Sequence, residues 1–148
     1  MSRLLRVFDL ERPLRDRLAA GMPTLSTCAG LILLSREILD GRPDQVPFGA
    51  LDLRVRRNGY GRQVQSFEAD IAIDPLGIVP FHAVFIRAPL IVSVGPDADV
   101  IASFGDNAVA VAKGPHLGLC FHPEMTDDPR LHQLFLDRAA AALEASAA

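Results

Sequence analysis

Residues 23–34 read Pro-Thr-Leu-Ser-Thr-Cys-Ala-Gly-Leu-Ile-Leu-Leu, and this stretch decides the fold. A short run with β propensity, residues 24–27, leads directly into Cys28, and an apolar run compatible with a helix follows at once. Small residues flank the cysteine: Ser26, Ala29 and Gly30. They suit a sharp strand-to-helix turn, because a nucleophile raised on such a turn leaves little room for large neighbours. The stretch therefore predicts a strand, a tight turn at Cys28 and a helix.

Cys28 is a candidate nucleophile on this turn. A cysteine in the first turn of a helix gains from the helix dipole, which favours the thiolate. The backbone N–H of Ala29 would point at the same spot and can serve as an oxyanion donor. A small buried cysteine in a packed strand is the alternative interpretation, and this segment alone does not separate the two.

The composition narrows the classes of protein. The 148 residues fit one domain spanning 1–148, with 49% hydrophobic and 22% charged residues. A net charge of −3 gives no electrostatic case for binding nucleic acid or an anionic membrane. Two cysteines, Cys28 and Cys120, form no disulfide framework, and they favour a reducing cytoplasm. We expect no signal peptide, and the longest apolar stretch, 77–95, is interrupted by charged residues and prolines.

The remaining periodicity predicts a layered α/β domain. A last helix starts at Pro129 or Arg130, and its inward residues are Leu131, Leu134, Phe135 and Leu143. The other expected helices are 3–10, 14–20 and one from Cys28 to about Leu39, and the expected further strands are 51–56, 67–73, 82–86, 100–104, 108–113 and 117–121.

The order of these elements is unusual for an α/β sheet. Two helices precede the first strand, and the strand before Cys28 would be a central one that needs neighbours on both sides. We therefore expect that the sequence starts in the middle of a fold.

A second motif supplies the partners that a thiol nucleophile needs. His122 and Glu124 follow the last predicted strand in the order His-Pro-Glu, and residues two apart in an extended segment share a side. The imidazole can act as the base for Cys28 while the carboxylate orients it. The other histidines, His82, His116 and His132, have no such neighbour pattern and are interpreted as structural. No clustered Cys/His spacing predicts a metal site.

Four motifs together resemble the glutaminase subunits of pyridoxal phosphate synthase, which are class I (triad) glutamine amidotransferases. They are Thr27-Cys28-Ala29-Gly30, Asn58-Gly59-Tyr60-Gly61-Arg62-Gln63, Phe85-Ile86-Arg87-Ala88-Pro89 and Phe121-His122-Pro123-Glu124. The likeness runs from Met1 into the last helix. It implies a three-layer, flavodoxin-like α/β fold with a mixed, mostly parallel sheet.

The resemblance also implies an activity and its residues. Cys28 would attack the side-chain amide of L-glutamine, His122 would be the base and Glu124 would orient it. Arg57, Ile86 and Arg87 would bind the substrate, and Ala29 would provide an oxyanion amide. A guanidinium suits the α-carboxylate of an amino acid. The hydrolysis needs no cofactor, and the ammonia would pass to a synthase subunit in a hetero-oligomeric complex that activates the glutaminase.

The sequence departs from that family in two ways. Ser26 stands where the family has glycine, which adds a Cβ to the turn. We also expect the chain to lack the family's N-terminal portion, including first strands and a Gly-Gly-Glu-Ser-Thr loop that donates the second oxyanion amide. Losing one such donor costs about 2.7–4 kcal/mol of transition-state stabilisation.

Two rival hypotheses remain open at this point. The first is a catalytically inactive subunit that only docks on the synthase, which the missing loop favours and the intact Cys28, His122 and Glu124 oppose. The second is another thiol hydrolase on a related fold, which leaves the segments 58–63 and Ile86-Arg87 unexplained.

Overall fold

The strand that leads to Cys28 lies beside the strand that leads to His122. In the computed structural model, which describes residues 1–57, 59 and 66–147, β1 (Thr24–Thr27) runs parallel to β9 (His116–Leu119). The register pairs Thr24 with His116 and Thr27 with Leu119. Both strands therefore end together, and the residues that follow them emerge at one edge of the sheet.

Three sheets are formed by the described residues. The largest has the order β1-β9-β8-β7, a second has the order β2-β3-β6, and β4 pairs with β5. The further strands are β2 (Glu37–Ile38), β3 (Leu53–Arg56), β4 (Ser66–Ile71), β5 (Phe81–Ile86), β6 (Leu90–Val94), β7 (Asp99–Phe104) and β8 (Asn107–Lys113). The helices are α1 (Ser2–Val7), α2 (Glu11–Ala19), α3 (Ala29–Leu34) and α4 (Arg130–Ala147), with 3₁₀ turns at Asp74–Leu76 and Pro123–Met125.

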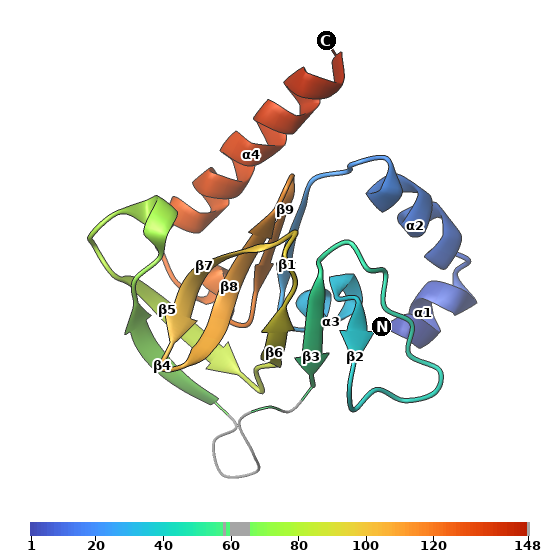
Figure 1. The fold of residues 1–148 in the computed structure, drawn as a ribbon, viewed down its shortest axis with the longest axis horizontal. Helices are drawn as coiled ribbons and strands as arrows, with labels where there is room; N and C mark the ends of the chain where they lie inside the picture. Colours follow the sequence, from blue (N-terminus) through green and yellow to red (C-terminus); the bar gives the residue numbers. More distant parts are fainter. Residues whose placement is uncertain (58, 60–65, 148) are drawn as a thin grey trace.

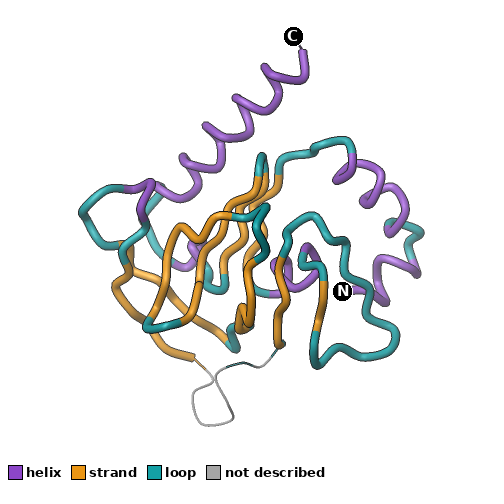
Figure 2. Tube along the Cα trace, viewed as in Figure 1, coloured by secondary structure: helices purple, strands orange, loops and turns teal. Residues whose placement is uncertain are grey.

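The mixed α/β architecture agrees with the expected fold class. Figure 2 shows the strands gathered in the middle of the molecule and helices around them. Within the described residues, β1–β9 and β2–β3 are parallel, whereas β3–β6, β4–β5, β7–β8 and β8–β9 are antiparallel. The expected predominance of parallel pairs is therefore not seen there. In the same part of the chain, β1 pairs on one side only, as an edge strand rather than a central one.

Close packing holds α3 against the sheet. Leu31 on α3 and Leu51 before β3 are both fully buried. A Cβ built on Gly118 of β9 would lie only 2.5 Å from Leu31 Cδ1 and 2.7 Å from Leu51 Cδ1. Glycine at this position lets α3, and with it the turn at Cys28, approach the sheet closely.

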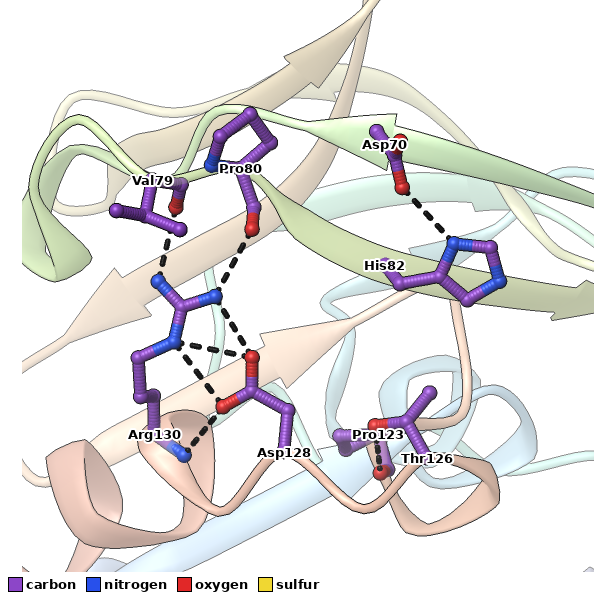
Figure 3. Close-up of polar contacts among 8 residues, drawn as sticks. All are labelled: Asp70, Val79, Pro80, His82, Pro123, Thr126, Asp128 and Arg130. Atoms are coloured by element: carbon purple, nitrogen blue, oxygen red, sulfur yellow. Dashed lines mark hydrogen bonds and ion pairs between the residues drawn. The ribbon is translucent and has the colours of Figure 1, made fainter.

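An arginine fixes the segment that carries His122 and Glu124. Arg130, at the start of α4, donates to the carbonyl oxygens of Val79 (2.8 Å) and Pro80 (2.9 Å) just before β5. Its guanidinium also pairs with Asp128 at 2.7 Å (Figure 3). These contacts tie the far end of the His122 segment to the adjacent β5 strand.

The structure corrects several details of the sequence prediction. The helix after Cys28 ends at Leu34 rather than near Leu39. The buried Ser35 has an extended backbone conformation, and its hydroxyl donates to the Ile32 carbonyl (2.7 Å). β6 was not predicted, since its apolar run lacks alternation. Leu143 does not face inward: its side chain is 63% exposed on the part of α4 that projects from the body (Figure 1).

Candidate active site

Cys28 lies on a strained turn between β1 and α3. Its backbone has φ 47° and ψ −103°, a left-handed region that a residue with a side chain rarely adopts. Its N–H donates to the Leu119 carbonyl at 2.9 Å, which extends the β1–β9 ladder by one residue. The predicted strand-to-helix turn is therefore present, and it raises the thiol at the end of the sheet.

The pKa of the Cys28 thiol is raised, whereas the sequence predicted a stabilised thiolate. Burial raises the pKa of Cys28, the Glu124 charge raises it further, and a hydrogen bond from the Ala29 N–H lowers it in part. The thiol donates to the Ile86 carbonyl, with an S···O distance of 3.7 Å. The direction of this pKa shift is opposite to the one expected from a helix dipole, because the partly buried sulfur is desolvated.

Ser26 fits into the turn without displacing it. Its side chain is buried and its hydroxyl donates to the Leu117 carbonyl at 2.9 Å. A Cβ built on Gly30 would lie 3.4 Å from the Ser26 Cβ, which is an ordinary contact. The departure from the family's glycine therefore adds a cross-strand hydrogen bond to this turn.

The His122 imidazole and the Glu124 carboxylate are in contact as predicted, although the backbone between them is not extended. His122 Nδ1 and Glu124 Oε1 are 2.7 Å apart. The intervening residues form the 3₁₀ turn Pro123–Met125 rather than an extended segment, and the His122 N–H donates to the Val84 carbonyl at 2.9 Å. A hydrogen bond at Nδ1 fixes the ring orientation and leaves Nε2 free to accept a proton.

The parallel pairing of β1 and β9 brings these groups to one place. Cys28 follows β1, His122 follows β9, and the charge of Glu124 acts on the thiol. Within the described residues, the thiol makes its hydrogen bond to Ile86 and makes none to the His122 ring.

The three expected substrate residues lie at two positions around Cys28. Ile86 ends β5, and its carbonyl accepts the thiol hydrogen bond. Arg87 follows it with an exposed side chain and a φ of 47°, a second strained residue next to the thiol. Arg57 follows β3 and borders a hollow of about 230 Å³ together with Ala29. Of the motif Asn58–Gln63, all but Gly59 lies outside the described residues.

Two further groups at this site were not predicted. Asp40 accepts a hydrogen bond from the backbone N–H of Arg57, with an N···O distance of 2.7 Å. Arg42 lines the hollow that Ala29 and Arg57 share. Both lie in the Asp-Gly-Arg-Pro-Asp loop, whose composition in the sequence is typical of a turn. Only the pairing of β2 with β3 in the folded chain places them next to Arg57.

His116, His82 and Cys120 have structural surroundings. His116 is buried and shares a 2.9 Å hydrogen bond with the Thr24 hydroxyl. His82 lies on the exposed face of the β4–β5 ribbon, between Asp70 (2.8 Å) and Glu68 (3.0 Å), which raise its pKa; Figure 3 shows the contact with Asp70. Cys120 is completely buried.

Residues 1–57, 59 and 66–147 contain no group of three metal-ligating side chains, and no helix there is long and apolar enough to span a bilayer.

The fold and the site define a mixed α/β protein with a candidate cysteine nucleophile beside a His–Glu pair. The model of the SNO glutamine amidotransferase family matches residues 1–141, and the chain belongs to this family.

Named relatives and a solved structure agree with the family. The chain is 55% identical over 142 residues to the pyridoxal 5'-phosphate synthase subunit PdxT of Mycobacteroides abscessus, which covers 95% of this chain and 72% of the relative. It is 53% identical over 141 residues to the subunit of the same name from Mycolicibacterium smegmatis, covering 93% and 72%. A structure described as a crystal structure of glutamine amidotransferase has a TM-score of 0.85 and 44% identity, covering 94% of this chain and 72% of that one.

Proposed function

We propose that this protein is the glutaminase component of a pyridoxal 5'-phosphate synthase. It hydrolyses L-glutamine to L-glutamate and ammonia, and it supplies the ammonia to a synthase partner subunit. Membership of the glutamine amidotransferase family and the relatives named as synthase subunits support this activity. The free thiols of Cys28 and Cys120 support a reducing cytoplasm as the compartment.

The observation that carries the chemistry is the 2.7 Å contact between His122 and Glu124 at the edge where Cys28 emerges. Nε2 of His122 takes the thiol proton, and the sulfur attacks the side-chain amide carbon of glutamine. The oxyanion of the tetrahedral intermediate forms next to the Ala29 N–H. His122 then protonates the leaving nitrogen, ammonia departs, and a glutamyl thioester remains on Cys28.

The same base completes the cycle. Water gives a proton to Nε2 of His122 and attacks the thioester carbon, and the thiol is restored when glutamate leaves. Glu124 accepts the Nδ1–H hydrogen bond throughout and stabilises the imidazolium that forms in each half-reaction. Arg57 and Arg87 supply the cationic groups for the substrate α-carboxylate.

The resting state of the thiol also supports activation by the partner subunit. The Cys28 proton is held on the Ile86 carbonyl, and burial favours the protonated form. Attack on glutamine requires that the thiol turn from Ile86 to His122. We expect the free chain to be slow and the complex with the synthase subunit to be faster.

Ammonia release from glutamine, measured with the synthase subunit present, tests the proposal. Cys28→Ala should reduce the rate to background, and Glu124→Gln should reduce kcat about 10²- to 10⁴-fold because the imidazole loses its orienting carboxylate. Cys120→Ala is the matched control and should retain activity. A wild-type complex that forms but releases no ammonia would establish the inactive docking subunit instead, and hydrolysis of esters without response to the synthase would indicate another thiol hydrolase.

A further inference from the structure

Asp40 makes an unassigned contact with a candidate substrate residue. It follows β2 on an exposed loop, and its Oδ1 accepts the backbone N–H of Arg57 across 17 positions of sequence at 2.7 Å. This distance is at the short end for an N–H···O hydrogen bond, as expected when the acceptor is a carboxylate.

The contact extends the pairing of two strands. β2 and β3 are parallel, with Ile38 opposite Val55, and the Leu39 N–H donates to the Val55 carbonyl at 2.9 Å. Beyond this point the backbone ladder stops, and the Asp40 side chain makes the next link, to Arg57. The direction in which the chain leaves β3 is therefore set by a side chain from the neighbouring loop.

Arg57 follows β3 and lines a hollow that extends to the residue after the nucleophile. It shares its hollow with Ala29, whose backbone N–H reaches the thiol of Cys28. Arg3 and Arg42 also line this hollow, whereas its acidic residue, Asp44, is paired with Arg6. The hollow therefore presents guanidinium groups beside Ala29, the residue that follows Cys28, and such groups suit the α-carboxylate of an amino acid.

We propose that Asp40 is a positioning residue for substrate binding: its carboxylate holds the Arg57 backbone so that the guanidinium meets the α-carboxylate of glutamine. This inference rests on the proposed glutaminase function. A side chain starts from the direction of its own backbone, and misplacing a binding group by about 1 Å is enough to weaken a site. Asp40 does not touch the substrate and takes no part in proton transfer.

The test compares two substitutions with a matched control. Asp40→Ala removes the acceptor, and Asp40→Asn keeps an oxygen that can accept the same hydrogen bond. Asp97→Ala removes another exposed carboxylate, whose contact with Lys113 is a weak 3.9 Å pair. Steady-state ammonia release with the synthase subunit gives KM and kcat, and calorimetric titration of glutamine into the same variants built on Cys28→Ala gives Kd without turnover.

We expect Asp40→Ala to raise KM and Kd about two- to tenfold, the size of one lost hydrogen bond, while kcat stays within about twofold. Asp40→Asn and Asp97→Ala should bind like the parent protein. In an Arg57→Ala background, Asp40→Ala should have no further effect, because it acts through Arg57.

Three results would overturn the inference: unchanged KM and Kd in Asp40→Ala, equal weakening in Asp40→Asn, or additive losses with Arg57→Ala. The two readouts separate this inference from the proposed function. If glutamine binds and Asp40→Ala weakens it while the wild-type complex releases no ammonia, the glutaminase proposal fails and the role of Asp40 stands. If glutamine does not bind at all, both fail.

Discussion

At the scale of single residues, the negative charge of Glu124 disfavours the thiolate form of Cys28. Burial and the Glu124 charge both raise the pKa of Cys28. A raised pKa means less thiolate at neutral pH, so alkylation of Cys28 by iodoacetamide should be slow at pH 7 and should accelerate up to a midpoint above that of an ordinary cysteine. Glu124→Gln removes one cause of the raised pKa, so the midpoint of its alkylation rate should move to lower pH.

This prediction has a built-in contrast. The same Glu124→Gln substitution should speed alkylation at pH 7 and slow glutamine hydrolysis, because the carboxylate hinders thiolate formation yet orients the His122 base. Alkylation rates from mass spectrometry across pH, beside ammonia release, give both numbers. Slower alkylation in Glu124→Gln would show that the carboxylate does not act on the thiol as the structure indicates.

Cys120 should react with the same reagent much more slowly than Cys28. It is completely buried, and burial raises its pKa, so neither access nor ionisation favours reaction in the folded chain. We expect one alkylated cysteine, Cys28, in native buffer and two in denaturant, identified by peptide mass spectrometry. Native modification of Cys120 would contradict the packing around β9.

At the scale of elements, the sequence predicted those parts that depend on local pattern. Residues 24–27 have β propensity and precede a turn made of small residues, so β1 was predicted with its observed bounds. Helix α3 was predicted too long, because its end depends on the hydroxyl of Ser35 and on the pairing of β2 with β3, neither of which is visible in an apolar run. β6 was missed because its apolar run shows no alternation, and its pairing with β3 forms only in the folded chain.

The site shows the same division. The His-Pro-Glu motif predicted the contact between His122 and Glu124 correctly, because the two residues are only two positions apart in the sequence. The hydrogen bond of the thiol with Ile86, the raised pKa of Cys28 and the contact of Asp40 with Arg57 all join segments that only the folded chain brings together. Spacing in the sequence carries no signal for such pairs. The substrate roles of Arg57, Ile86 and Arg87 stay predictions.

The contact between α3 and β9 yields an element-level prediction. Gly118→Ala places a methyl group within 2.7 Å of the buried Leu31 and Leu51 side chains, and overpacking of this kind costs about 1–3 kcal/mol. Chemical denaturation should show this loss in the free energy of unfolding. Gly30→Ala on α3 is the matched control: its methyl would meet only an ordinary contact, so no comparable loss is expected. Equal stability of Gly118→Ala and the parent would mean that α3 does not pack this closely.

At the scale of the whole molecule, stability should fall steeply from β8 to α1. Four consecutive residues of β8, from Val109 to Ala112, are buried, and β8 is paired on both sides, by β7 and β9. By contrast, α1 has no buried residue, and Leu4 and Val7 are 59% and 65% exposed. Opening the hydrogen bonds of α1 therefore disturbs little apolar packing, whereas opening β8 disrupts the largest sheet.

Hydrogen exchange followed by mass spectrometry measures this gradient. Amides of β8 and β9 should exchange only through global unfolding, and those of α1 should exchange orders of magnitude faster, close to the rate of an unprotected peptide. Repeating the experiment at several protein concentrations controls for association, which would cover the exposed apolar side chains of α1. Protection of α1 equal to that of β8 at every concentration would contradict the gradient. Protection that rises with concentration would show that a second copy covers this helix in solution.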